Sequence, residues 1–282
     1  MHGEADAENA GVSTFLATAV DIVRRAGDIQ LERRESGFRI TKKGTIDLVT
    51  EVDVECERMC RDVIAERFPE HDVLAEEFGT GGSSRPASRW RWVFDPLDGT
   101  TNYAHGLPIF CASLGLEVDG RTEVGAVFDP TRQELFTAER GHGAHLNGQP
   151  LAVSATPKLL DALLVTGFPY DVHERAGDLV ELFGAFLAQA RAIRRLGSAA
   201  LDLCYVAAGR FDAFWEQHLK PWDVAAGALI VEEAGGRMTG MDGSPFNPAN
   251  AHLIASNGRV HDEMIACVRE FRHRRRQKRT TS

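Results

Sequence analysis

The sequence predicts an α/β protein whose two halves differ: an α+β N-terminal half and an α/β C-terminal half. Two observations carry this prediction. Two amphipathic helical patterns precede a series of β-prone runs up to about residue 150, and strand-like and helix-like segments then alternate up to about residue 272. At 282 residues, the chain is long enough for one large or two modest domains. We expect domains at residues 13–150 and 151–272, between a flexible N-terminus (residues 1–12) and a basic, disordered tail (residues 273–282).

The N-terminal half begins with two expected helices. Between Ser13 and about Ser36, apolar residues recur on one helix face, and Ser13 is a suitable N-cap. A second helix is expected from Thr50, because Thr50 and Asp53 form the Thr-x-x-Asp pattern of a capping box. The strands expected after it lie at residues 73–74, 90–94, 110–118, 123–128 and 133–138, with a hairpin turn at residues 119–120. This half is therefore predicted to be two helices followed by a largely antiparallel sheet.

The C-terminal half alternates between strand and helix patterns. Strands are expected at residues 159–166, 192–196, 210–214 and 253–255. Helices are expected at residues 178–190, 198–208, 223–234 and 260–271. The third helix is followed by two glycines, which are a common helix stop. Alternation of this kind is typical of helices packed on a sheet.

The composition limits the function classes. The chain has 32 Lys and Arg against 41 Asp and Glu, a formal net charge of −9, which argues against general binding to nucleic acid or an anionic membrane. A phosphorylated substrate would also be repelled unless cations intervene. No basic, apolar leader opens the chain, and the longest charge-free run, residues 99–116, is too polar to span a membrane. Five scattered cysteines indicate packed, reduced thiols, so we expect a cytoplasmic protein.

The most informative segment is Asp-Pro-Leu-Asp-Gly-Thr-Thr-Asn at residues 95–102, directly after an apolar strand. Asp95 and Asp98 stand three residues apart, and Gly99 and Thr100 precede a possible helix start. A helix N-terminus offers free N–H groups to a phosphate, and a glycine lets the anion approach closely. Two carboxylates beside a phosphate-binding site would repel the phosphate unless they bind divalent cations. A ligand set of oxygen atoms alone favours Mg²⁺. The alternative is that one aspartate is a turn acid and the other an N-cap.

Acids at the ends of other elements strengthen the metal interpretation. Glu76 and Glu77 end a strand, Asp53 lies in the first turn of one helix, and Asp223 lies where another helix begins. Each alone has a simpler explanation, because acids stabilise helix N-termini and Glu77 can be a solvated surface group. Together they place carboxylates at the ends of several separate elements, which is how a rigid scaffold assembles a multi-metal site.

Six motifs, in family order, resemble those of the inositol monophosphatase family of Mg²⁺-dependent, Li⁺-sensitive phosphatases. They lie at residues 47–53, 76–77, 92–102, 134–150, 197–199 and 222–227. The likeness extends from about residue 13 to residue 272. One departure is Ala75, where many members have a glycine before the acidic pair. The resemblance implies a layered αβαβα sandwich of the sugar-phosphatase type.

The resemblance also implies a ligand set for two or three Mg²⁺ ions. Glu76, Asp95 and the carbonyl of Leu97 would hold one ion. Asp95, Asp98 and Asp223 would share a second, and Glu76 would contact a third.

Further roles follow from the same resemblance. Gly99 and Thr100 would bind phosphate. Asp47 and Asp53 would either donate or accept hydrogen bonds with Thr100 or lie in the shell of residues around it. A family lysine corresponds to one of two positions, Lys42 or Lys43. The resemblance also implies that four residues face the hydroxyl-bearing ring of the substrate: Gly197, Ser198, Ala199 and Glu216. Asp98 and Asp223 are implied to bind substrate as well.

These expectations combine into one reaction: hydrolysis of inositol monophosphate, or of a related small polyol or sugar phosphate, by a metal-activated water that Glu76 and Thr100 orient. The same fold acting on histidinol phosphate or fructose 1,6-bisphosphate is one alternative. A regulatory protein that binds RNA or the transcription machinery through the basic run at residues 274–279 is another. A haloacid-dehalogenase phosphatase is disfavoured, because its Asp-x-Asp-Gly-Thr motif is one residue shorter. The resemblance implies a homodimer, with neither a membrane nor nucleic acid as an expected partner.

Overall fold

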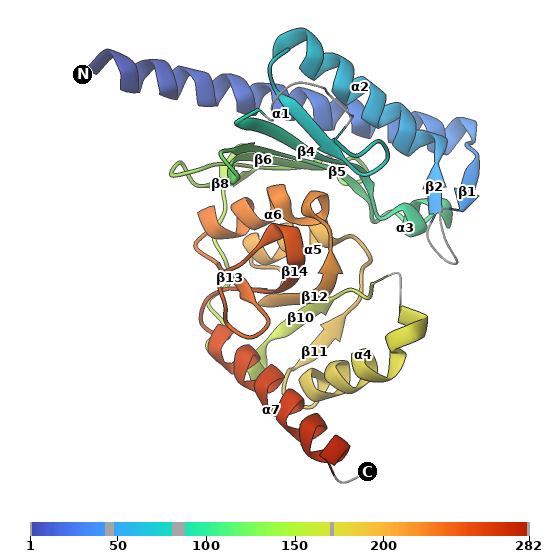
Figure 1. Cartoon of the computed structure of the whole chain (residues 1–282), viewed down its shortest axis with the longest axis vertical. Helices are drawn as coiled ribbons and strands as arrows, with labels where there is room; N and C mark the ends of the chain where they lie inside the picture. Colours follow the sequence, from blue (N-terminus) through green and yellow to red (C-terminus); the bar gives the residue numbers. More distant parts are fainter. Residues whose placement is uncertain (1, 43–47, 81–87, 170–171, 281–282) are drawn as a thin grey trace.

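The computed structural model of the protein describes residues 2–42, 48–80, 88–169 and 172–280. Five layers follow one another in Figure 1, and they confirm the expected αβαβα arrangement. From top to bottom they are α1 (His2–Ser36) with α2 (Glu51–Arg67), a seven-stranded sheet, α5 (Ala199–Ala207) with α6 (Pro221–Glu233), a five-stranded sheet, and α4 (Val172–Leu187) with α7 (His261–Thr280). Among the described residues, no helix combines the length and apolarity needed to cross a membrane.

The upper sheet is antiparallel except for its first pair of strands, as the N-terminal pattern predicts. In spatial order its strands are β3 (Asp72–Ala75), β4 (Trp90–Asp98), β5 (Cys111–Val118), β6 (Arg121–Asp129), β7 (Glu134–Glu139), β8 (Ala144–Leu146) and β9 (Gln149–Pro150). The last two lie in a glycine-rich segment whose pattern does not predict strands. A short helix, α3 (Thr100–Ala104), follows β4, and a two-stranded ribbon of β1 (Ile40–Lys42) and β2 (Leu48–Thr50) precedes α2.

The lower sheet contains the alternating elements of the C-terminal half. In spatial order its strands are β11 (Ala192–Arg194), β10 (Leu163–Thr166), β12 (Ala213–Leu219), β14 (Ala251–Ser256) and β13 (Arg237–Gly240), with 3₁₀ turns at η1 (Leu159–Asp161) and η2 (Pro248–Asn250). The first three strands are parallel and the last two are antiparallel to their neighbours. Strand β12 continues past the predicted end at Phe214, first through Trp215, which lies in the core, and then through residues 216–219, which line a cavity.

Helix α6 lies in the middle layer and packs against β5 and β6 above and β14 below. Most of its residues are buried, because it has partners on both sides. It lies so close to the upper sheet that a Cβ atom on Gly125 would come within 2.9 Å of the carbonyl oxygen of Ala226. The close packing fixes the start of α6, and with it Asp223, relative to the upper sheet.

The two terminal helices are longer than expected. Helix α1 begins at His2 instead of Ser13, through the segment expected to be a flexible N-terminus, residues 1–12. That segment is rich in alanine and glutamate and has no proline, which favours a helix. Helix α7 continues to Thr280, through most of the segment expected to be a disordered tail, residues 273–282. There Arg275 forms ion pairs with two acids of α4, Asp178 and Glu181, which a hydrophobic pattern does not reveal.

The cysteines are as the sequence predicts. All five lie in the described residues, are buried, and are not bonded to one another. They therefore pack as small apolar side chains.

Candidate active site

The turn between β4 and α3 sets the position of the two motif aspartates. Strand β4 carries Asp95 into the interior, where it is only 2% exposed. Asp95 and Asp98 pair with Ser113 and Cys111 of β5, and the pairing is irregular at the two residues between them. Gly99 has φ of +98°, and a Cβ atom there would lie 2.8 Å from the carbonyl oxygen of Ile109. Only glycine fits this turn without strain, and α3 starts at the next residue.

Asp98 connects the upper sheet to the middle layer. Its carboxylate accepts hydrogen bonds from the Ser198 hydroxyl (2.7 Å) and from the backbone N–H groups of Ala200 (2.7 Å) and Ala199 (3.3 Å). It therefore serves the N-terminus of α5, whose first N–H groups have no acceptor within the helix. This contact brings residues 197–199, predicted to face the substrate, beside the acidic motif.

Asp53 lies directly behind Thr100. The predicted capping box of α2 is confirmed, because the N–H and hydroxyl of Thr50 both donate to Asp53 Oδ2, at 2.7 and 2.6 Å. The other oxygen of Asp53 lies 3.4 Å from Thr100 Oγ1. The same hydroxyl donates to the carbonyl oxygen of Leu97 at 2.9 Å. Asp53 and Leu97 therefore orient the Thr100 hydroxyl together.

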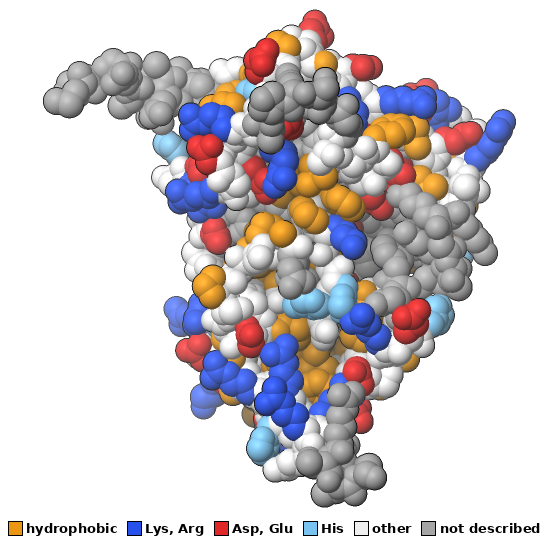
Figure 2. Space-filling model, in the orientation of Figure 1, with side chains coloured by type: hydrophobic (Ala, Val, Ile, Leu, Met, Phe, Trp, Pro, Cys, Tyr) orange, Lys and Arg blue, Asp and Glu red, His pale blue; other side chains and the backbone are white. Residues whose placement is uncertain are grey.

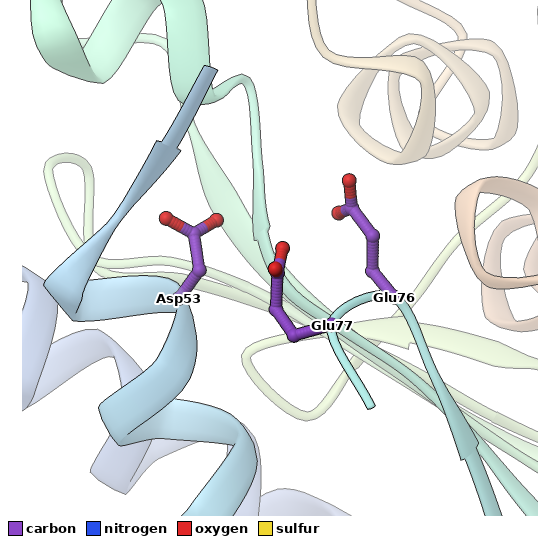
Figure 3. Close-up of side chains that lie close together, drawn as sticks. All are labelled: Asp53, Glu76 and Glu77. Atoms are coloured by element: carbon purple, nitrogen blue, oxygen red, sulfur yellow. The ribbon is translucent and has the colours of Figure 1, made fainter. Parts of the chain in front are cut away.

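Glu76 and Glu77 lie on the turn after β3. Figure 3 shows their carboxylates and that of Asp53 on one side of this turn, and one oxygen of each lies within 4.8 Å of the others. The turn is held by Glu57 of α2, which is fully buried and accepts a hydrogen bond of 2.8 Å from the N–H of Glu77. Glu57 also forms a 2.7 Å ion pair with Arg61. Glu77, for which a solvated role is the simple alternative, is thus part of an acidic group.

Two further acids approach from the lower half. Asp223, in the first turn of α6, accepts a hydrogen bond of 2.6 Å from the N–H of Lys220. Glu216, on β12, is 7% exposed. A Cβ atom on Gly167 would lie 2.1 Å from a carboxylate oxygen of Glu216, so the glycine leaves the space that this carboxylate fills.

These side chains surround a cavity of about 570 Å³. Asp53 is not in its lining, and lies behind it, against Thr100 and beside Glu76. Two residues expected near the site, Asp47 and Lys43, lie outside the described residues, as does the side chain of Lys42. The predicted residues that do line the cavity are Glu76, Asp95, Leu97, Asp98, Gly99, Thr100, Gly197, Ser198, Ala199, Glu216 and Asp223.

The cavity is strongly acidic: among the described residues that line it are five carboxylates, against one arginine and one lysine. Burial raises the pKa of Asp95 well above its usual value, and repulsion from Glu76, Asp98 and Asp223 raises it further. Burial, followed by repulsion from Asp98, raises the pKa of Asp223 to about 7. The ionised carboxylates therefore destabilise one another, and a bound cation would relieve that repulsion.

Two buried acids near the cavity have no counterpart in the sequence-based predictions. Glu57 positions the turn after β3, and its only sequence signal is a place one helical turn after Asp53. Asp202, on α5, is 1% exposed, and neither of its carboxylate oxygens has a hydrogen-bond partner in the described part of the chain. Burial, then repulsion from Glu216 and Asp98, raises its pKa well above the usual value. Its only signal is an aspartate within an apolar helix.

The five layers and the acid-lined cavity between them define a layered α/β protein of the phosphatase type. The chain belongs to the inositol monophosphatase family, whose sequence model matches residues 12–274. It is 42% identical over 259 residues to the protein named Nus factor SuhB of Salmonella typhimurium (strain 14028s), covering 91% of this chain and 96% of that protein. It is 41% identical over 254 residues to inositol-1-monophosphatase of Synechocystis (strain PCC 6803), covering 90% of this chain and 88% of that protein.

Solved structures give the same picture of the fold. Inositol monophosphatase from Anabaena sp. PCC 7120 superposes with a TM-score of 0.83 at 38% identity, covering 92% of this chain and 97% of that one. An IMPase/NADP phosphatase solved with Mg²⁺ and phosphate superposes with a TM-score of 0.78 at 26% identity, covering 91% of this chain and 95% of that one. The match to the family confirms the resemblance found in the sequence.

Proposed function

We propose that this protein is a Mg²⁺-dependent phosphomonoesterase that hydrolyses inositol monophosphate, or a related small polyol phosphate, by direct attack of water. The observation that carries the proposal is the convergence of Glu76, Asp95, Asp98 and Asp223 on one cavity. Burial and repulsion between carboxylates raise the pKa values of Asp95 and Asp223, and burial raises that of Asp98. Two relatives are named as inositol monophosphatases, and the structure of a third was solved with Mg²⁺ and phosphate bound. These relatives support the same reaction.

The donor set fits Mg²⁺, because it consists of carboxylates and a backbone carbonyl, which are hard oxygen ligands. We assign one ion to Glu76, Asp95 and the carbonyl of Leu97, and a second to Asp95, Asp98 and Asp223. The acidic group of Figure 3 leaves room for a third ion at Glu76. When bound, Mg²⁺ neutralises phosphate oxygens and lowers the pKa of water.

The chain's own residues then position the reactants. Glu76 and the Thr100 hydroxyl, which Asp53 and Leu97 hold, orient the water that attacks phosphorus. The bond from phosphorus to the polyol oxygen breaks, and that oxygen leaves with the proton that the water gives up. Backbone N–H groups of Gly99 and Thr100 donate to the phosphate oxygens. On the opposite side of the cavity, residues 197–199 contact the polyol, and Glu216 accepts hydrogen bonds from its hydroxyl groups.

A substrate panel with detection of released phosphate tests this function. We expect activity on inositol 1-phosphate that requires Mg²⁺, is lost on exhaustive chelation, and is inhibited by Li⁺. Single turnover in ¹⁸O-labelled water should place the label directly in phosphate, whereas a trapped phosphoenzyme would rule out direct water attack. A large preference in kcat/KM for histidinol phosphate or fructose 1,6-bisphosphate would contradict inositol monophosphate as the substrate, while the proposal of a phosphatase would still hold.

A second candidate function is regulatory binding to RNA or to the transcription machinery. The name Nus factor for a 42% identical relative favours it, as does the arginine-rich end of α7, where Arg272, Arg274 and Arg276 are exposed. Deletion of residues 273–282 separates the two functions. Phosphatase activity should survive the deletion, and any salt-sensitive RNA binding should disappear. A homodimer and a cytoplasmic location stay predictions, and ultracentrifugation of the purified chain checks the first.

A further inference from the structure

One side chain of the active-site cavity has no part in the reaction proposed above: Arg195, in the segment between β11 and α5. It is exposed, and it is the one arginine among the described residues that line the cavity. In the part of the chain that the structure describes, no carboxylate, carbonyl oxygen or aromatic ring engages its guanidinium. The N–H donors of Arg195 are therefore available to a ligand.

Other arginines of the protein already have partners. Figure 2 shows several blue side chains on the lower part of the visible face, around the helix that Figure 1 labels α7. There Arg274 pairs with Glu270 of the same helix. Four residues before Arg195 in the sequence, Arg191 pairs with Asp161. An arginine without such a partner, beside an acid-lined cavity, is a candidate for binding a ligand.

The backbone holds the Arg195 side chain on the substrate side of the cavity. Gly197 has φ of +89°, and a Cβ atom there would collide with Nη1 of Arg195. The guanidinium therefore lies against Gly197, the first of the residues assigned to contact with the polyol. The segment between them is fixed to α3, because the amide of Asn102 donates a hydrogen bond of 2.8 Å to the carbonyl oxygen of Leu196.

The charge of Arg195 reaches Glu216 on β12. Burial and then repulsion from Asp223 raise the pKa of Glu216, and the charge of Arg195 opposes this rise. Among the described residues, however, no ion pair or hydrogen bond engages the carboxylate of Glu216. A cationic donor and an anionic acceptor thus line one cavity without being bonded to each other. A hydroxyl-bearing molecule suits this pair, because a hydroxyl group can accept a hydrogen bond from one and donate to the other.

We propose that Arg195 is a specificity-determining residue whose guanidinium donates hydrogen bonds to hydroxyl oxygens of the polyol. The inference rests on the proposed function and deepens it, because it explains how the site selects a polyol over an alcohol with no further hydroxyl groups. Arginine suits this role because its planar guanidinium presents two parallel N–H groups, which match the oxygens of two neighbouring hydroxyl groups. Arg195 binds the polyol before and during the reaction alike, so it should affect KM more than kcat.

Kinetics with two ring phosphates tests this role. The compounds myo-inositol 1-phosphate and cyclohexyl phosphate share a ring and a phosphate ester, but the second has no hydroxyl groups on its ring. Both are assayed at saturating Mg²⁺ with the wild type, Arg195→Met and the control Arg191→Met. In Arg195→Met, the preference in kcat/KM for the inositol compound should fall by about tenfold, mainly through a higher KM. Arg191→Met should keep the wild-type preference, because Arg191 is exposed and does not line the cavity.

Three results would overturn the role of Arg195. The first is no preference for the inositol compound in the wild type, or a preference that Arg195→Met keeps. The second is an equal loss of kcat/KM on both compounds in Arg195→Met, because the guanidinium would then act on the phosphate that both carry. The third is an equal loss of preference in both arginine variants, which would indicate a general effect of positive charge.

A binding measurement separates this role from the function on which it rests. If neither compound releases phosphate, the phosphatase assignment fails. Titration calorimetry in Mg²⁺ buffer, applied to any compound that is not hydrolysed, then decides the role of Arg195 alone. Weaker binding of myo-inositol 1-phosphate by Arg195→Met than by Arg191→Met, without such a difference for cyclohexyl phosphate, supports the role. Equal affinities of the two variants for the inositol compound, or no binding of it by the wild type, reject the role.

Discussion

The two sides of the active-site cavity are built on opposite principles. We call Glu76, Asp95, Asp98 and Asp223 the acidic wall, and residues 197–199 with Glu216 the facing wall. In the acidic wall, burial and mutual repulsion raise the pKa of Asp95, and similar causes raise that of Asp223. In the facing wall, the Ser198 hydroxyl and the N–H groups of α5 are already used as donors to Asp98.

This difference separates two tasks. A wall of repelling carboxylates is completed only by a cation, so it is suited to bind metal and phosphate together. In the facing wall, the groups of residues 198–200 are fixed by hydrogen bonds, and Glu216 adds a buried carboxylate whose pKa is raised by burial and by repulsion from Asp223. A wall that combines fixed groups with one acidic acceptor is suited to select the leaving polyol. Changes in the acidic wall should therefore affect turnover, and changes in the facing wall should affect the choice of substrate.

The largest effect is expected for Asp95→Asn. The amide removes a charge assigned to both metal sites, so kcat should fall by about 10³-fold or more. Thermal unfolding in the absence of metal should show an intact fold at least as stable as that of the wild type, because the variant cannot ionise at a buried site where its neighbours repel a negative charge. The control is Asp119→Asn, a hairpin residue whose φ of +52° asparagine tolerates. Its ion pair with Arg89 is exposed and contributes little to stability, so turnover should be unchanged and Tm nearly so. Wild-type turnover by Asp95→Asn would refute the assignment of the acidic wall.

A smaller and different effect is expected for Glu216→Gln in the facing wall. Loss of a carboxylate acceptor should raise KM for inositol 1-phosphate by about tenfold while kcat changes little. Gly167→Ala should act in the same direction, since its Cβ atom would lie 2.1 Å from a carboxylate oxygen of Glu216. If either variant lost turnover as Asp95→Asn does, the division between the two walls would be wrong.

Glu57→Gln should weaken the acidic wall indirectly. Glutamine keeps one acceptor for the turn after β3 but loses the ion pair with Arg61, so the turn and Glu76 become less well held. We expect an increase of about threefold to tenfold in the Mg²⁺ concentration needed for half-maximal rate, with kcat at saturating Mg²⁺ nearly unchanged. Glu66→Gln, on an exposed position of the same helix, is the matched control. Equal Mg²⁺ requirements in the two variants would contradict a positioning role for Glu57.

The smallest effect concerns stability in the absence of metal. The folded protein holds the proton of Asp223 up to about pH 7, whereas the unfolded chain releases it near pH 3.8. Folding therefore binds a proton between these values, and the contribution of Asp223 to stability falls as the pH rises from about 4 to 7. With Mg²⁺ chelated, Asp223→Asn should gain Tm relative to the wild type across this window, by a few degrees at about pH 7. Added Mg²⁺ should reverse the order, and a pH-independent difference would argue against the raised pKa.

The sequence predicts the acidic wall well because its members follow clear breaks in hydrophobic pattern. Asp95 and Asp98 directly follow an apolar strand, and Asp223 lies where a helix is expected to begin. Their positions at the ends of elements indicate that they lie near one another, and all three line the cavity. Glu57 and Asp202 are not predictable in this way, since each is a buried acid inside a helix whose role depends on contacts with distant segments. The irregular end of β12 cannot be predicted from the sequence for a related reason. Its polar side chains line cavities, so the strand lacks the alternation of apolar and polar residues that a half-buried strand shows.

The hydrogen bonds of Asp98 have a consequence for how the layers are held. Asp98 belongs to the upper sheet, and its three donors belong to the start of α5 in the layer beneath. Asn102 adds a parallel tie, because its amide donates to the carbonyl oxygens of Ile109 and Leu196, at 2.9 and 2.8 Å. Any sliding of α5 along the upper sheet must break these bonds in the same step that takes the cavity apart. Ligand occupancy and the alignment of α5 with the upper sheet are therefore thermodynamically linked, and filling the cavity should slow the separation of these two layers.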